Sequence, residues 1–219
     1  MSIKAVIFDM DGVLIDSENL WQQSERQLFA ALGVELTDSL LAQSRGLRTQ
    51  EMIDHWCAMF NITSRTPEAL IEQYDSQMLK KMRNEVPLME GAVEAILFFK
   101  EKNIPLALAS CSTMDHIKAA MGKYNLSKHF DLMVSAANGM PGKPHPEVYL
   151  QTATRLGIAP TDCLAIEDSF FGVISAKAAR MKVLAPPDPH EFDQERFGVA
   201  DIKIRSLTEI NDALLEELK

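Results

Sequence analysis

Short apolar runs alternate with amphipathic stretches through most of this 219-residue chain, and this alternation restricts the fold more than any other feature. Each run is followed by turn residues, as in strands that are buried on both faces. The runs are residues 3–8, 104–109, 132–136, 163–166 and 183–185, with a weaker one at 202–204. Helical patterns occupy residues 91–102, 113–124, 146–156, 169–179 and 207–218. This order predicts βαβ units, and therefore an α/β fold with a Rossmann-like parallel sheet.

One stretch, residues 16–86, does not follow the alternation. It contains three amphipathic helical patterns, at residues 17–32, 49–60 and 67–83, and no clear strand. We therefore expect an all-helical domain, inserted after the first strand of the α/β core. The core would consist of residues 1–15 and 87–219, and the chain would cross between the two domains after Ile15 and at Val86–Pro87.

The charge and the cysteines restrict partners and location. A net charge of −9 argues against nucleic acid or an anionic membrane surface as a partner, because both require a basic surface. No apolar stretch approaches the roughly 18 residues of a membrane span. Asp9 and Asp11 stand where a signal peptide would need its apolar segment, so secretion is not expected. The three cysteines are widely spaced, as expected for reduced thiols. We expect a cytoplasmic protein.

Acidic pairs follow two of the predicted strands. Asp9 and Asp11 flank Met10 at the end of the first strand, where alternating carboxylates point the same way. One could act as a nucleophile and the other could transfer protons, although such a pair also occurs in calcium loops and ordinary turns. Glu167 and Asp168 follow residues 163–166, where they could bind Mg²⁺, or Asp168 could cap the next helix.

Two further signals follow other strands. Ser110 and Cys111 stand where a strand passes into a helix, so a hydroxyl and nearby amides could hold an anionic oxygen, or a serine could cap the helix. Lys143 lies between Gly142 and Pro144, where it could neutralise a phosphoryl group or remain a solvated surface lysine. Ligands of open α/β sheets bind at the carboxyl ends of strands, so the four signals converge there. Together they predict phosphoryl transfer on a small phosphorylated metabolite.

These four signals resemble the motifs of the haloacid dehalogenase superfamily of phosphotransferases, along the whole chain. The motifs are the run from Asp9 to Glu18, then Ser110, then Lys143, then the pair Glu167–Asp168. The inserted helices resemble the four-helix-bundle cap of the first subclass. Residues 15–21, 46–48, 143–150 and 175–181 are further similar to sugar-phosphate phosphatases of this family, those for hexitol phosphates and 2-deoxyglucose 6-phosphate.

The resemblance implies a role for each matching residue. Asp9 would attack phosphorus and form an aspartyl-phosphate, and Asp11 would serve as the acid and base. Mg²⁺ would be held by Asp9, the Asp11 carbonyl and Asp168, with Glu167 in support. Residues that would contact the phosphate are Met10, Ser110, Cys111 and Lys143, and Arg48 matches a cap arginine that would contact the substrate. The resemblance also implies a monomer.

Two other functions remain open at this point. A sugar-phosphate mutase of the β-phosphoglucomutase type would carry a cap histidine twelve residues after the nucleophile, where this chain has Trp21. Trp21 could pack against a sugar or fill the hinge, and Glu18 could bond substrate hydroxyls or favour the start of a helix. A non-enzymatic protein on this fold would have lost a catalytic residue, and none is lost here.

Overall fold

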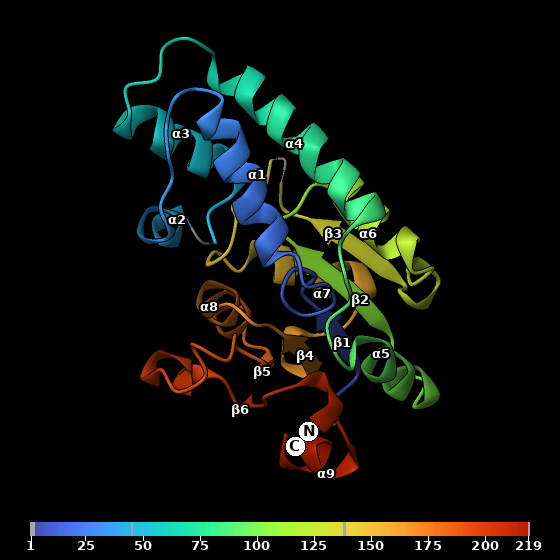
Figure 1. The fold of residues 1–219 in the computed structure, drawn as a ribbon. Helices are drawn as coiled ribbons and strands as arrows, with labels where there is room; N and C mark the ends of the chain where they lie inside the picture. Colours follow the sequence, from blue (N-terminus) through green and yellow to red (C-terminus); the bar gives the residue numbers. More distant parts are fainter. Residues whose placement is uncertain (1–2, 45, 138, 219) are drawn as a thin grey trace. The chain divides into compact units, whose positions relative to one another are not determined.

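The structure is a computed structural model, and it describes residues 3–44, 46–137 and 139–218. The chain divides into two compact units (Figure 1). Unit 1 comprises residues 1–16 and 87–219, and unit 2 comprises residues 17–86.

Unit 1 is built on a six-stranded sheet in which all neighbouring strands are parallel, in the order β3-β2-β1-β4-β5-β6. The prediction of a Rossmann-like parallel sheet is therefore confirmed. The strands are β1 (Ala5–Phe8), β2 (Leu106–Ser110), β3 (Leu132–Ser135), β4 (Cys163–Ile166), β5 (Lys182–Ala185) and β6 (Ile202–Lys203). β1 lies between β2 and β4, so three carboxyl ends come together in the middle of the sheet.

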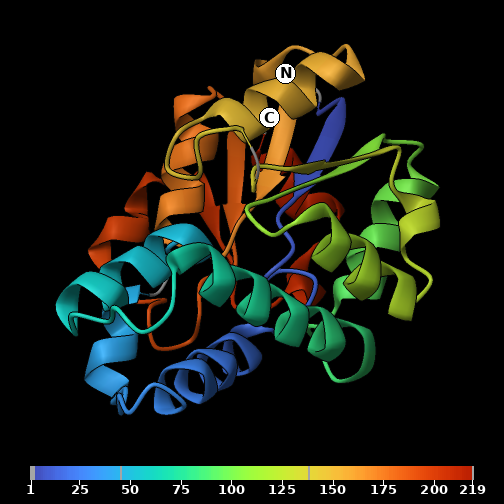
Figure 2. The same cartoon turned by 90° about the horizontal axis from the view of Figure 1, so that it is seen from above.

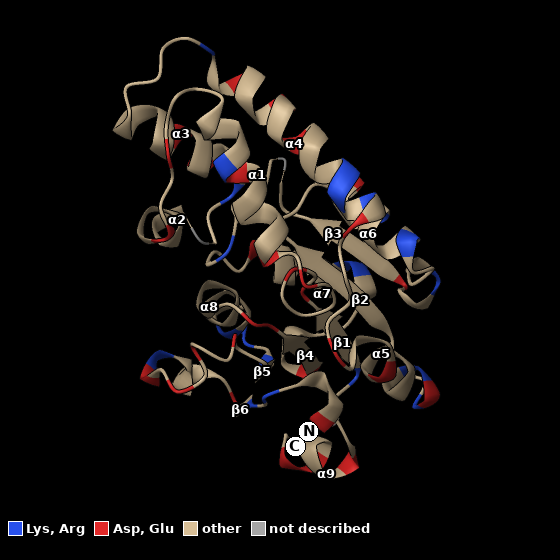
Figure 3. Cartoon of the chain, viewed as in Figure 1, with Lys and Arg blue, Asp and Glu red and all other residues tan. Residues whose placement is uncertain are grey.

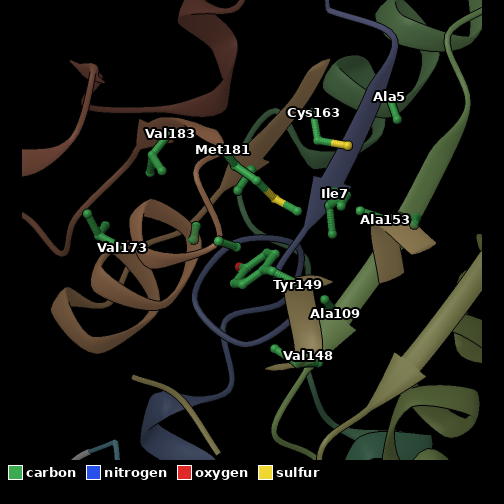
Figure 4. Packing of buried hydrophobic residues seen from close by; sticks show 14 of the residues in the cluster. Ala5, Ile7, Ala109, Val148, Tyr149, Ala153, Cys163, Val173, Met181 and Val183 are labelled. Atoms are coloured by element: carbon green, nitrogen blue, oxygen red, sulfur yellow. The ribbon is translucent and has the colours of Figure 1, made fainter. Parts of the chain in front are cut away.

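The two faces of this sheet carry side chains of different size, because residues alternate between faces along each strand. One face carries mostly small side chains, such as Ala5, Ala107 and Ala165, and packs against α7 (Glu147–Leu156) and α8 (Phe170–Ala178). Figure 4 shows this packing, with Tyr149 of α7 at its centre. On the other face Phe8 packs edge-on against Phe99 of α5 (Ala92–Glu101), 6.0 Å between centroids.

The remaining elements of unit 1 connect these layers. α6 (Met114–Lys123) begins after Thr113, whose side chain accepts a hydrogen bond from the amide of His116. Figure 2 shows α7 and α8 on the same side of the sheet. Short 3₁₀ turns are η1 (Ser127–His129), η2 (Pro160–Asp162), η3 (Glu195–Val199) and η4 (Leu207–Glu209).

The last predicted helix, residues 207–218, is wrong as a single element. It is divided into η4 and α9 (Asp212–Glu217), because the side chain of Asn211 accepts from the amide of Leu214 and starts a new helix. Figure 3 marks acidic residues on α9 and basic residues at the C-terminal end of α4.

Unit 2 is all helical in the residues that the structure describes. Its helices are α1 (Glu18–Ala30), α2 (Asp38–Ser44), α3 (Thr49–Met59) and α4 (Pro67–Asn84). Both α1 and α3 pack against α4. The sequence did not predict α2, because a seven-residue helix with buried side chains only at Leu41 and Ser44 is too short to show a helical period. Among the described residues, no helix combines the length and the apolar character that crossing a membrane requires.

Candidate active site

The candidate site lies at the carboxyl ends of β1, β2 and β4. Asp9 follows β1 directly, and its amide donates to the carbonyl of Ile166 at the end of β4 (2.9 Å). Ser110 is the last residue of β2, and Glu167 follows β4. Three of the predicted signals therefore meet at adjacent strand ends, because the strands themselves are adjacent.

Lys143 joins these strand ends. Its ammonium donates to Asp9 Oδ1 (2.6 Å), to the carbonyl of Ala109 in β2 (3.1 Å) and to Glu167 Oε1. The lysine side chain is only 8% exposed, and that of Glu167 is fully buried. The three protons of the ammonium thus have three acceptors from three strand ends, which fixes the position of the charge.

The loop that carries Lys143 is itself held in place. Ser175, a buried residue of α8, donates from its hydroxyl to the carbonyl of His145 (2.7 Å). The loop then enters α7, so the lysine is supported by two helices that pack on the same face of the sheet. Lys143 is therefore not the solvated surface lysine that the sequence also allowed.

Asp9, Glu167 and Asp168 each offer one carboxylate oxygen, and these oxygens lie within 4.8 Å of one another. Asp168 Oδ1 is buried without a hydrogen-bond partner among the described residues. An unpaired buried carboxylate oxygen is costly unless a cation reaches it. Hard oxygen donors of this kind fit Mg²⁺, so the residues present suit the ion that the resemblance implies.

Gly12 makes room for this group of acids. Its φ is +75°, and a Cβ there would stand 2.1 Å from Asp168 Oδ2. The turn after Asp9 is closed by the carbonyl of Met10, which accepts from the amide of Leu14 (2.9 Å). Glycine is therefore required here both by the backbone and by the approach of Asp168.

Burial dominates the electrostatics of the site. It raises the pKa of Asp9 to about 8, against the attraction of Lys143. Burial also raises the pKa of Asp168 well above its ordinary value, with repulsion from Glu167 as the next cause. Desolvation would lower the pKa of Lys143, but the attraction of Asp9 and Glu167 outweighs it, and the pKa lies well above the usual value. A divalent cation would favour the ionised carboxylates at this site.

Asp11 faces the end of β2. Its Oδ2 accepts from the hydroxyl of Ser112 (2.8 Å) and, at a longer distance, from that of Ser110 (3.5 Å). Ser110 Oγ in turn accepts from the amide of Ser112 (3.0 Å). This arrangement links the acid–base candidate to the predicted anion-binding segment. The sequence pattern did not predict this contact between Ser112 and Asp11.

Met10 and Cys111 can contribute less through their side chains. The Met10 side chain is fully buried, so any contact with a ligand must come from its main chain. Cys111 is half-buried beside Lys143, and burial raises the pKa of its thiol, which keeps it a weak nucleophile.

Tyr149 is a second residue that the sequence analysis missed. Its hydroxyl donates to Glu167 Oε1 (2.6 Å), and its ring lies 5.1 Å from the Lys143 ammonium. The only signal for it was its position on the apolar face of a helix, six residues after Lys143, which is also what an ordinary core residue shows.

The other three predicted residues belong to unit 2. Glu18 is the first residue of α1, and its Oε1 accepts from the side-chain amide of Gln22 (2.7 Å). Trp21 packs against Tyr74, with 5.8 Å between ring centroids. Arg48 precedes α3 and forms an ion pair with Glu51.

Known proteins resemble the chain over most of its length. It is 37% identical over 209 residues to hexitol phosphatase B of Escherichia coli (strain K12), covering 95% of this chain and 94% of that protein. It is 32% identical over 179 residues to a phosphorylated carbohydrates phosphatase of Thermotoga maritima, covering 81% and 82%. The structure of a β-phosphoglucomutase from Clostridium difficile matches its fold with a TM-score of 0.84 and 22% identity, covering 99% of this chain and 96% of that one.

A family model also matches most of the chain. The model for haloacid dehalogenase-like hydrolases matches residues 6–185, a range that includes Asp9, Lys143 and Asp168. The mutase match is a likeness of fold, and one fold supports different reactions. Together with the arrangement of the strand ends, the match shows that this chain belongs to the haloacid dehalogenase-like hydrolase family.

Proposed function

We propose that this protein is an Mg²⁺-dependent phosphatase that hydrolyses a small sugar phosphate or sugar-alcohol phosphate through an aspartyl-phosphate. The observation that carries the proposal is the buried Lys143 ammonium, which bonds Asp9 and Glu167 beside the unpartnered oxygen of Asp168. A fixed cation next to a carboxylate nucleophile, with room for a metal, suits the transfer of an anionic phosphoryl group.

Asp9 is the nucleophile in this proposal. Its carboxylate oxygen attacks phosphorus, the new P–O bond forms, and the bond from phosphorus to the ester oxygen breaks. Asp11 gives its proton to the departing oxygen, which leaves as an alcohol. Lys143 holds Asp9 in place and balances the charge that it shares with the phosphoryl group, while Ser110 and the main chain at Cys111 bind phosphoryl oxygens.

Water completes the cycle. Asp11, now ionised, takes a proton from a water molecule, whose oxygen forms a bond to phosphorus as the bond to Asp9 breaks. Inorganic phosphate leaves, and both aspartates regain their starting states. Mg²⁺, held by Asp9, the Asp11 carbonyl and Asp168 with Glu167 in support, would supply electrostatic stabilisation of the phosphoryl oxygens.

The relatives support the substrate class. Two of them are named for phosphatases of hexitols and of phosphorylated carbohydrates, and the chain covers most of each. We propose that unit 2 acts as the cap and that Glu18, Trp21 and Arg48 contact the part of the substrate beyond the phosphate. A single chain supplies all of these residues, so a monomer would suffice.

The test is hydrolysis of p-nitrophenyl phosphate by the purified protein with Mg²⁺. We expect phosphate release by the wild type and none above background by Asp9→Asn. Asp115→Asn makes the same change in the first turn of α6 and should retain wild-type activity. Equal rates for wild type and Asp9→Asn, with or without Mg²⁺, would contradict the proposal.

Product analysis with hexitol and hexose phosphates then separates the two enzymatic candidates. A phosphatase releases inorganic phosphate and the free sugar or polyol. An isomerised phosphate ester as the main product would instead show a mutase.

A further inference from the structure

Tyr149 is a buried aromatic residue of unit 1 whose polar end reaches the candidate site. The residue has no exposed surface, and its hydroxyl donates to Glu167 Oε1 at 2.6 Å. A core position on α7 needs only an apolar side chain, and Val148 beside it is one. The hydroxyl therefore serves a purpose besides packing, because a buried hydroxyl must find a partner and this one finds a carboxylate of the site.

Glu167 is held from several sides. Its Oε1 accepts from both Tyr149 and Lys143, and its Oε2 accepts from the hydroxyl of Ser169 (3.3 Å). Helix α8 also packs tightly on it, since a Cβ on Gly172 would stand 1.9 Å from Oε2. A carboxylate fixed in this way can in turn fix the donor that it faces, which is Lys143.

Tyr149 also touches that donor. The Lys143 ammonium lies 5.1 Å from the centre of the Tyr149 ring, within the range of a cation–π contact. One side chain thus contacts both members of the Lys143–Glu167 pair. The phenol remains neutral beside these charges, because burial and the charge of Glu167 raise its pKa well above the ordinary value.

On these contacts, and resting on the proposed function, we propose that Tyr149 is a positioning residue for the reaction, whose hydroxyl holds Glu167 against Lys143 and so aims the ammonium at Asp9. Without the hydroxyl, Glu167 Oε1 loses one of its two donors, and the carboxylate can rotate toward other partners. Lys143 then keeps its charge but loses the fixed direction of its bond to Asp9.

Tyr149→Phe tests this inference, because it removes one oxygen and leaves the ring and its packing in place. We expect kcat for p-nitrophenyl phosphate to fall roughly tenfold, as for the loss of one hydrogen bond to a charged group. KM should change little, and the melting temperature should fall by only a few degrees, as expected for one lost buried hydrogen bond in a chain of this size. The matched control is Thr152→Val, which removes another buried hydroxyl from α7, one that donates to the carbonyl of Val148. This control should retain the wild-type kcat.

A second measurement does not depend on activity. The ammonium of Lys143 is buried and bonded to three acceptors, so its protons should exchange slowly enough to give a distinct ¹H–¹⁵N resonance. We expect this resonance to shift or broaden in Tyr149→Phe and to stay in place in Thr152→Val. An unchanged resonance overturns the positioning role whatever the activity. A shifted resonance with unchanged kcat overturns its importance for the reaction.

The two proposals can fail separately. If the wild type hydrolyses no phosphate ester, the proposed function is wrong, and the resonance still decides whether Tyr149 positions Lys143. If the wild type is active and the resonance of Tyr149→Phe matches that of the wild type, only the inference about Tyr149 is wrong.

Discussion

Lys143 shows how single residues set the chemistry of this site. Three carboxylates, those of Asp9, Glu167 and Asp168, lie together around one buried ammonium, so the site carries more negative than positive charge. Burial alone would force such acids into their neutral forms. The lysine offsets part of this cost, and a divalent cation would offset the rest. At the scale of the residue, metal binding at this site and the stability of the folded protein are therefore coupled.

The role of Gly12 gives a prediction at this scale. Gly12→Ala places a methyl group at φ +75° and against Asp168, so it should destabilise the protein and displace the carboxylate. Gly157→Ala is the matched control, because its φ is +69° and no atom lies within 4 Å of the added Cβ. Both variants should lose about 1–2 kcal/mol from the left-handed backbone.

The two glycine variants should differ in their response to Mg²⁺. We expect Mg²⁺ to raise the melting temperature of the wild type and of Gly157→Ala, and to have no such effect on Gly12→Ala. Thermal unfolding with and without the ion measures this. A normal Mg²⁺ response in Gly12→Ala would show that Asp168 is not needed for binding.

At the scale of elements, unit 2 depends on a polar network buried between its helices. Glu25 of α1 is 6% exposed, and its Oε1 accepts from the hydroxyl of Ser44 in α2 (2.7 Å) and from the indole of Trp56 in α3. One carboxylate oxygen thus joins three helices. Burial raises the pKa of Glu25 above its ordinary value, although the two hydrogen bonds pull it down.

This network predicts a dependence of stability on pH. Because the pKa of Glu25 is higher in the folded state, its contribution to stability is full below the ordinary pKa of glutamate and is lost as the pH rises through the raised value. Glu25→Gln keeps a side-chain oxygen that can accept from Ser44 and Trp56. Because glutamine does not ionise, the variant does not lose this stability as the pH rises. The stability of the variant relative to the wild type should therefore increase when the pH is raised from 4.5 to 7.5.

Urea unfolding of both proteins at the two pH values measures the difference. Glu191→Gln, a glutamate of unit 1, serves as the control for a change in net charge, and it should show a smaller dependence on pH. If Glu25→Gln is less stable than the wild type at pH 7.5, the carboxylate is ionised and stabilising, and this account of the network is wrong.

At the scale of the whole molecule, the chain enters and leaves unit 2 through two paired segments of unit 1. The amide of Asp16 donates to the carbonyl of Pro87 (3.0 Å), and the amide of Met89 donates to the carbonyl of Leu14 (3.0 Å). Ile15 and Leu88 form an antiparallel bridge between them. The ends of the insertion are thus tied together within unit 1, as is typical of an inserted domain.

A deletion tests the independence of unit 1. We expect a protein in which a short Gly-Ser linker replaces residues 17–86 to fold, because the paired ends need only a tight connection. Circular dichroism should show an α/β spectrum and one cooperative thermal transition. The deletion variant should retain slow Mg²⁺-dependent hydrolysis of p-nitrophenyl phosphate and lose any preference for sugar phosphates. A chain without a cooperative transition would contradict this prediction.

Residues and elements could be predicted from the sequence where their signal is local, and could not be predicted where their position depends on packing. Asp9, Lys143 and Asp168 could be found because each follows a strand or a turn that the sequence marks. Tyr149 could not, since only the packing of α7 on the sheet brings its hydroxyl to Glu167. The helix α2 was missed because its burial comes from Leu41 and from the bond of Ser44 to Glu25, which no periodicity records.

The three acceptors of Lys143 also carry information about the order of folding. They lie 134, 34 and 24 residues away along the chain, at the ends of strands that flank one another only in the finished sheet. Contacts of such long separation form late, because large loops must close first. During refolding, the recovery of catalytic activity should therefore lag behind the recovery of helical content. Activity would then serve as a measure of the last step in assembly of the sheet.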